Sequence, residues 1–163
     1  MGTVLPRTGI GQDSHRFDEP ESGKPLMLGG VRIPDAAGLR GNSDADVVLH
    51  ALTNAVSGIS GTNVLGAISD EMCRGGTTDS AEYLRYALGT LTKMRLCHVS
   101  VAIECATPVL APHIDAIRAS IASLCGIAVS DVGVTATSGE GLTGFGRGEG
   151  IQALAIVTAV REE

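Results

Sequence analysis

Aromatic residues are scarce in this chain of 163 residues: they make up 2% of the sequence, and tryptophan is absent. The apolar fraction of 44% therefore rests mainly on Ala, Val, Ile and Leu, so we expect a core of small aliphatic side chains. A subunit with such a core often gains stability by burying further surface against copies of itself. The length suits one compact unit, and residues 1–163 are taken as a single domain.

Positive charge is also scarce, with a net charge of −6 and only two lysines, Lys24 and Lys93. Because the chain has no basic run, we expect no nucleic-acid groove, and an anionic substrate would need a metal, backbone amides or a few placed arginines. No apolar run reaches the length of a membrane span, and the N-terminus lacks a secretory apolar region. The cysteines, none of them in a CxxC pair, are Cys73, Cys97, Cys105 and Cys125. The sequence thus predicts a cytoplasmic protein with reduced thiols and no membrane contact.

Hydrophobic patterning predicts both strands and helices. The expected strands are a glycine-containing one at 3–17, two short ones within 25–34 that turn at Gly29-Gly30, and three more at 98–104, 132–137 and 150–160. The expected helices are 44–57, 80–93 and one that Pro112 opens and Gly126 ends. Residues 58–79 carry little periodicity and are expected to form a long loop. Helices that alternate with strands, together with hairpins, favour an α+β or mixed α/β layer fold.

The helix expected at 44–57 separates polar from apolar residues. Ser43 is the expected N-cap, and Asp46 follows where a carboxylate meets the free amides of the first turn. The apolar stripe contains Val48, Leu49, Ala51, Leu52, Ala55 and Val56, whereas Asp46, His50, Thr53, Asn54 and Ser57 lie on the other side. His50 is therefore not expected to be a core histidine.

Asp13 and His15 form the first chemistry-bearing pair. Residues two apart on a strand point to the same face, where a carboxylate and an imidazole can bind one divalent ion. The motif alone is weak, since such triplets arise by chance. His50 is the natural third ligand, with an ordinary surface histidine as the alternative. Asp46 either orients the His50 ring or only caps the helix start, and the cap is favoured. Three protein ligands leave one position open, as in catalytic zinc sites.

Four sequence blocks together resemble a known family. They read GQDSHRF, PLMLGGVRIP, GNSDADVVLHAL and GFGRGEGI, and their order and spacing cover nearly the whole chain. In this combination the chain resembles the cyclodiphosphate synthases of the methylerythritol phosphate route to isoprenoids. The resemblance implies a homotrimer of ferredoxin-like α+β subunits, each with a mixed sheet packed on helices, and active sites between neighbouring subunits.

The implied reaction is an intramolecular phosphoryl transfer. The 2-phosphate of 4-diphosphocytidyl-2-C-methyl-D-erythritol 2-phosphate attacks the β-phosphate, which gives 2-C-methyl-D-erythritol 2,4-cyclodiphosphate and CMP. By resemblance, Asp13, His15 and His50 hold one Zn²⁺ per active site, and Glu140 meets a Mg²⁺ or Mn²⁺ at the diphosphate. The family therefore implies a phosphorus–oxygen lyase.

The resemblance also assigns a substrate site. Ser138 stands where the family has a threonine hydroxyl near the reacting phosphate, so Ser138 and Asn42 take the catalytic positions. The implied substrate-binding residues are Asp13, His15, Asn42, Ser43, Gly66, Cys105, Ala106, Thr107, Pro108, Val109, Leu110, Ala111, Thr137, Ser138, Glu140, Phe145 and Arg147. Segment 105–111 would receive the cytidine through its backbone. Arg147 either contacts a phosphate or pairs with Glu149 to hold a glycine-rich turn.

Several positions depart from the family pattern. Asn42 replaces a histidine, and segment 63–66 lacks the aspartate that meets an erythritol hydroxyl, for which Asn63 or Asp70 are the available substitutes. The loop at 68–72 is also altered, and two expected lysines are Val109 and Gly141. The favoured interpretation is a divergent synthase. The alternatives are a non-catalytic metal- or nucleotide-binding homologue and a metal-dependent phosphohydrolase.

Overall fold

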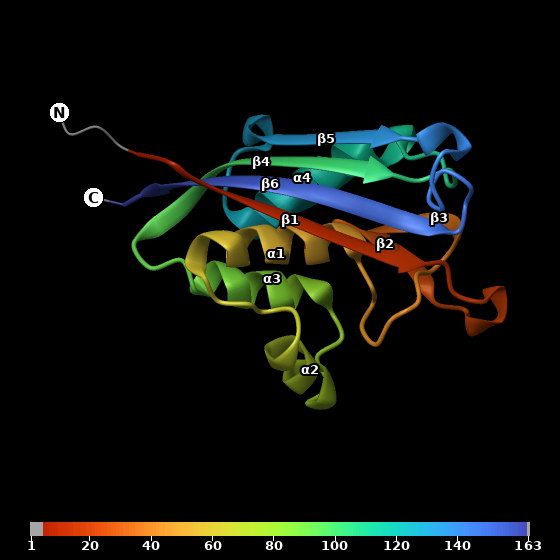
Figure 1. The fold of residues 1–163 in the computed structure, drawn as a ribbon, viewed down its shortest axis with the longest axis horizontal. Coiled ribbons are helices and arrows are strands. Elements are labelled where there is room, and N and C mark those ends of the chain that lie inside the picture. Colours follow the sequence, from red (N-terminus) through yellow and green to blue (C-terminus); the bar gives the residue numbers. More distant parts are fainter. Residues whose placement is uncertain (1–4, 163) are drawn as a thin grey trace.

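The structure, a computed structural model, describes residues 5–162 (Figure 1). Its strands are β1 (Arg7–Arg16), β2 (Pro25–Leu28), β3 (Val31–Ala37), β4 (Met94–Glu104), β5 (Val132–Thr137) and β6 (Gly150–Arg161). Its α-helices are α1 (Val47–Ser60), α2 (Ala67–Arg74), α3 (Ser80–Gly89) and α4 (Ile114–Cys125). Short 3-10 turns lie at Pro20–Ser22, Ala111–His113, Val129–Asp131 and Gly139–Gly141.

The main sheet has four strands in the order β1-β6-β4-β5. Strand β6 pairs antiparallel with β1 and with β4, whereas β4 and β5 are parallel. Strands β1, β4 and β5 therefore run in one direction, so their carboxyl ends lie at the same end of the sheet (Figure 1). β2 and β3 form a separate hairpin, as the glycine pair predicts. The expected α+β fold, with a mixed sheet packed on helices, is confirmed.

The backbone of β1 lies almost in contact with the backbone of α1. A Cβ built on Gly9 would lie 2.0 Å from the carbonyl oxygen of Ala55, and one on Gly11 would lie 2.0 Å from that of Ala51. Both distances are impossible for a real side chain, so only glycine fits at these two positions. The strand predicted at 3–17 is β1, which is shorter than predicted: it spans Arg7–Arg16, Leu5 and Pro6 precede it outside any strand, and residues 3 and 4 lie outside the described residues.

Helix α1 is buried on both sides because it lies between the sheet and α3 (Figure 1). The side chains of Thr53 and Ser57, placed on the polar side by the sequence, are 0% and 4% exposed. They satisfy their own polar atoms locally: the Thr53 hydroxyl donates to the Leu49 carbonyl at 2.7 Å, and the Ser57 hydroxyl accepts from the Val64 amide at 3.4 Å. The polar side of this helix is thus a second buried face rather than a surface.

The helix predicted at 44–57 begins three residues later, and its N-cap is Asp46, not Ser43. The Asp46 carboxylate accepts from the amides of Val48 and Leu49, and also from those of Gly29 and Gly30 in the hairpin turn. Four hydrogen bonds from backbone amides stabilise Asp46 as the N-cap more than a single serine hydroxyl would stabilise Ser43 there. The helix therefore begins later than predicted. The favoured interpretation of Asp46 as a helix-start carboxylate is confirmed.

The long loop predicted at 58–79 is wrong. Helix α1 continues to Ser60 and ends at Gly61, whose φ of 78° is the left-handed conformation that stops a helix. Residues 67–74 then form α2, a helix of 8 residues whose Ser69 hydroxyl accepts from the Gly66 amide. Ile68 and Met72 pack on the core, but two apolar contacts in so short a segment give little periodicity to detect.

Two further boundaries differ from the prediction. Helix α3 ends at Gly89 rather than at residue 93, and β4 begins at Met94, four residues before the predicted 98. The first turn after Pro112 is 3-10, so α4 starts at Ile114, while Gly126 ends it with a φ of 66° as expected. The strands predicted at 132–137 and 150–160 are β5 and β6.

Gly11→Ala should separate β1 from α1. Because the new methyl group would overlap the Ala51 carbonyl, we expect a loss of about 1–3 kcal/mol in stability, read as a lower urea midpoint. Gly58→Ala is the matched control: it lies in α1 beside the same strand, its Cβ would have 3.6 Å to the nearest atom, and it should raise stability by about 1 kcal/mol. Equal midpoints for Gly11→Ala and the unchanged protein would contradict the packing.

Candidate metal and substrate site

A hollow of about 230 Å³ opens where the carboxyl end of β1 meets the first turn of α1. The residues around it come from β1, α1, α2, α3, the loop before α1 and the segment between α1 and α2. They are Asp13, His15, Gly41, Asn42, Ser43, His50, Leu65, Ser69, Asp70, Cys73 and Tyr83. The structure therefore brings Asp13, His15 and His50 together with Asn42 and Ser43, as the sequence predicts.

Three side-chain atoms of this hollow converge on one point. Asp13 Oδ2 lies 2.9 Å from His15 Nε2 and 2.9 Å from His50 Nδ1, and the two nitrogens are 3.3 Å apart. Tetrahedral zinc with ligands at about 2.0–2.2 Å holds its ligand atoms about 3.3 Å from one another. The carboxylate and imidazole donors are thus nearly at the spacing of metal ligands, and the cluster fits a metal ion.

Each histidine uses its other ring nitrogen for a hydrogen bond. His15 Nδ1 lies 2.7 Å from the Arg40 carbonyl oxygen, and His50 Nε2 lies 2.9 Å from the Ser80 hydroxyl. A hydrogen bond of this kind fixes the tautomer and ring orientation of a metal-binding histidine. With 8% of its surface exposed, His50 is neither a surface histidine nor an apolar core residue, but a buried wall of the hollow.

The ionisable groups of the cluster shift one another's pKa values. Burial raises the pKa of Asp13, but the hydrogen bonds and charges of His15 and His50 outweigh it and hold that pKa at about 2. The hydrogen bond to Asp13 raises the pKa of His15, against the effect of burial. Asp13 is therefore an anion placed between two imidazoles, which suits the binding of a cation.

A second hollow, of about 280 Å³, lies at the carboxyl ends of β4 and β5. Its walls are Cys105, Ala106, Pro108, Val109, Leu110, Ala111, Ile114, Val134, Ala136, Thr137 and Ser138. Eight of these belong to the substrate residues implied by the resemblance. The sheet order places β1 and β5 on opposite edges, three strand spacings or about 14 Å apart, so the two hollows lie beside opposite edge strands at one end of the sheet.

The remaining predicted residues line neither hollow: Gly66, Thr107, Glu140, Phe145 and Arg147. Glu140 is exposed and not part of the Asp13 cluster, and its amide donates to the Ser138 hydroxyl at 3.4 Å. Of the two interpretations of Arg147, the structure shows the pairing, because its Nε donates to Glu149 Oε1 at 3.2 Å. That ion pair braces the glycine-rich turn before β6.

Sequence reasoning missed five residues that line the first hollow: Gly41, Leu65, Ser69, Cys73 and Tyr83. Three of them lie at or in α2, the helix that the sequence did not indicate. Asp70 on the same helix also lines the hollow, whereas Asn63 does not, which separates the two substitutes considered for the missing aspartate. No local signal would have found Tyr83, since only the packing of α3 on α1 brings its ring 6.1 Å from the His50 ring.

Fold and site together define an α+β protein with a three-residue cluster that fits a metal ion. The chain belongs to the YgbB family, whose profile matches residues 6–160. It is 43% identical over 156 residues to the 2-C-methyl-D-erythritol 2,4-cyclodiphosphate synthase of Chlamydia muridarum, a match covering 94% of this chain and 88% of that protein. The corresponding synthase of Chlamydia felis is 44% identical over 156 residues, covering 94% and 89%. These matches confirm the resemblance inferred from the sequence.

Solved structures share the fold. The bifunctional IspDF of Campylobacter jejuni superposes with a TM-score of 0.89 at 29% identity over 99% of this chain, which spans 44% of that longer protein. A 2C-methyl-D-erythritol-2,4-cyclodiphosphate synthase in its CDP-bound form has a TM-score of 0.77 at 34% identity, covering 93% of this chain and 98% of that one. Within residues 5–162, none of the helices has the combined length and apolarity that crossing a bilayer requires.

His50→Ala should abolish stoichiometric zinc binding, because it removes one of three converging donors and leaves a carboxylate and one imidazole. The measurement is zinc content after dialysis, with competition against a chromogenic chelator. His98→Ala is the matched control, since His98 is exposed on β4 and lies outside the cluster. Zinc retained at one equivalent by His50→Ala would remove His50 from the ligand set.

Proposed function

We propose that this protein converts 4-diphosphocytidyl-2-C-methyl-D-erythritol 2-phosphate into 2-C-methyl-D-erythritol 2,4-cyclodiphosphate and CMP. The convergence of Asp13, His15 and His50 at one end of the sheet carries the proposal, because a cyclisation between two phosphates needs a fixed positive charge there. The 43–44% identity to synthases of this reaction supports it.

The metal of the cluster is proposed to be Zn²⁺, one per active site, because a carboxylate and two imidazoles are typical zinc donors. When bound, the ion supplies positive charge to the β-phosphate. Asp13, His15 and His50 would hold it, and the Asn42 amide on the rim of the same hollow would donate to a phosphate oxygen. Asn42 cannot supply the charge of a protonated histidine, so positioning is its proposed contribution.

The second hollow is proposed to take the cytidine diphosphate part of the substrate. Segment 105–111 turns over this hollow and offers backbone groups, and a related structure carries CDP. Ser138 lies on the same wall, where its hydroxyl would donate to the reacting phosphate. Glu140, exposed next to it, is the proposed ligand of a second ion, Mg²⁺ or Mn²⁺, at the diphosphate.

A homotrimer with active sites between subunits would join the two hollows. In one chain they lie at the same sheet end but beside opposite edge strands, β1 and β5. Side-by-side packing of copies would set the β1 edge of one subunit against the β5 edge of the next. The cluster of one chain would then face the nucleotide hollow of its neighbour.

Exposed apolar side chains on the open face of the sheet, the face opposite the helices, support a trimeric assembly. Ile10 and Ile156 stand opposite each other on β1 and β6, and they are 69% and 44% exposed. Leu154, two residues away on β6, is 41% exposed on the same face. Contiguous exposed apolar side chains on a sheet mark a surface that is covered in the assembled protein.

Asp70 is the proposed partner of a substrate hydroxyl. Asp70 lines the hollow that holds the metal cluster, although it comes from α2 and not from segment 63–66. A carboxylate at this position can accept a hydrogen bond from an erythritol hydroxyl. The cytoplasm is the proposed location, since all four cysteines are free thiols.

Incubation of the purified protein with the 2-phosphate substrate, Zn²⁺ and Mg²⁺ should release CMP and form the cyclic diphosphate, both followed by ³¹P NMR and mass spectrometry. Asp13→Ala should abolish both products, because it removes the anion between the two imidazoles. Asp70→Asn should raise the KM about tenfold or more, because it weakens a charge-assisted hydrogen bond.

The products distinguish the alternatives. CMP with an uncyclised diphosphate product would identify a hydrolase and refute the synthase. A protein that binds zinc and CDP but yields no product would be a binding homologue. An unchanged KM in Asp70→Asn would leave the synthase standing but remove Asp70 from the substrate site.

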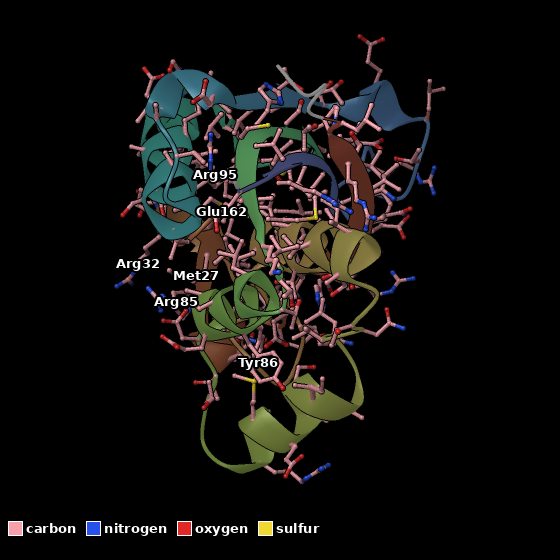
Figure 2. The ribbon with its side chains drawn as sticks, turned by 90° about the vertical axis from the view of Figure 1, so that its left-hand side faces the viewer. Met27, Arg32, Arg85, Tyr86, Arg95 and Glu162 are labelled. Carbon is pink, nitrogen blue, oxygen red and sulfur yellow. The ribbon has the colours of Figure 1, made fainter. Side chains whose placement is uncertain are left out.

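Ile156→Glu should dissociate the assembly at micromolar concentration, because it would bury an unpaired charge between subunits. Light scattering coupled to size exclusion should show trimers for the unchanged protein and monomers for this variant, with turnover lost. Tyr86→Glu is the control, since Tyr86 is 48% exposed on α3, in the helical layer away from the open face of the sheet (Figure 2). A monomer with full turnover would overturn the shared active site.

A further inference from the structure

We infer that Asp44 and Ser80 form a hydrogen-bonded relay that holds the His50 ring with Nδ1 directed at the metal position. Both are positioning residues, since they act through His50. The inference rests on the proposed metal site and adds to it two side chains outside the ligand cluster.

The relay runs from the ligand cluster to the start of α3. His50 Nδ1 faces Asp13 at 2.9 Å, and on the opposite side of the ring Nε2 lies 2.9 Å from the Ser80 hydroxyl. That hydroxyl is in turn hydrogen-bonded to Asp44 Oδ1. The Ser43 hydroxyl, at 3.5 Å from the same nitrogen, is the more distant neighbour.

The direction of the protons follows from Asp44. Its carboxylate also accepts from two backbone amides, that of Ser80 at 3.2 Å and that of Asp46 at 3.1 Å. A carboxylate only accepts, so the Ser80 hydroxyl must donate to it and is left to accept from the His50 ring. When a metal ion takes the place of the proton between Asp13 and His50, the remaining ring proton is therefore on Nε2, and the lone pair of Nδ1 is directed at the metal position.

The two histidines are thus held in opposite tautomers. His15 keeps its proton on Nδ1, which donates to the Arg40 carbonyl, and presents Nε2 to the cluster. Only the His50 support is made of side chains, so only that support can be removed by substitution without altering the backbone. Carboxylate groups that act on a metal through a histidine are a recurring means of fixing ring orientation and basicity.

The relay is separate from the walls that a substrate would touch. Ser80 is 0% exposed, and neither Ser80 nor Asp44 lines the metal hollow or the nucleotide hollow. Asp44 instead borders another depression, which Met27 and Arg85 also line (Figure 2). A change in the relay should therefore alter metal binding and leave substrate contacts intact.

A purely structural role for the same residues makes a different prediction. Asp44 accepts the amide of Ser80 at the start of α3, so it also helps to cap this helix. Asp79 is the N-cap of α3, and its side chain accepts from the Ala81 amide at 2.8 Å without reaching His50. Asp79→Ala therefore removes a cap from the same helix and spares the relay.

Ser80→Ala and Asp44→Asn should each weaken Zn²⁺ binding about 10- to 100-fold, measured by competition with a chromogenic chelator. At saturating Zn²⁺, the KM for the nucleotide substrate should stay within twofold of the unchanged protein. Asp79→Ala should lower the melting temperature but keep the Zn²⁺ affinity. Unchanged Zn²⁺ affinity in both folded relay variants, or an equal loss in Asp79→Ala, would overturn the relay.

A measurement on the unchanged protein does not depend on the folding of variants. In the Zn²⁺-loaded protein, ¹H–¹⁵N correlation spectra of the imidazoles should show the ring proton of His50 on Nε2, with a nuclear Overhauser effect to Ser80, and that of His15 on Nδ1. An Nε2 proton of His50 without contact to Ser80 would overturn the relay, whereas a proton on Nδ1 would remove that nitrogen from the metal site. If the unchanged protein binds no Zn²⁺, the proposed metal site fails; if it binds Zn²⁺ and only these tests fail, the relay alone is wrong.

Discussion

The close approach of β1 to α1 determines the metal site. Gly9 and Gly11 leave the strand backbone bare where the Ala55 and Ala51 carbonyls of the helix lie against it. Side chains alternate along a strand, so Asp13 and His15 continue the face that these glycines begin. Two strand residues beyond the contact are therefore within reach of His50, and a larger residue at either glycine would move the ligands apart.

The helical side of the site is held just as firmly. The Asp46 carboxylate accepts four backbone amides, two from the first turn of α1 and two from the hairpin turn at Gly29 and Gly30. His50 lies one turn into this helix, and a hydrogen bond between its Nε2 and the Ser80 hydroxyl holds the side of the ring that faces away from the cluster. Strand, hairpin and helix thus fix the donors before any metal binds, which lowers the ordering cost of binding.

The sequence predicted those parts of the site that local patterns carry. The alternation of β1 places Asp13 and His15 together, and helical spacing separates His50 from the apolar stripe, so all three ligands were within reach of sequence reasoning. Asp44, Ser80 and Tyr83 were not, because their relation to His50 arises from the packing of α3 on α1. Thr53 and Ser57, which the sequence places on the side away from the apolar stripe, are buried as well.

Different parts of the fold hold the metal cluster of Asp13, His15 and His50 and the substrate rim, by which we mean Asn42 and residues 63–72. The cluster depends on glycines and caps of the β1–α1 contact, which admit almost no other residues. The rim is carried by the segment after α1 and by α2, an 8-residue helix whose turns can exchange side chains without moving that contact. Asp70 of α2 lines the same hollow, so it is the available replacement for the aspartate that the resemblance implies in segment 63–66. This architecture therefore allows the residues of α2 and of the segment before it to change while the three donors of the cluster keep their places.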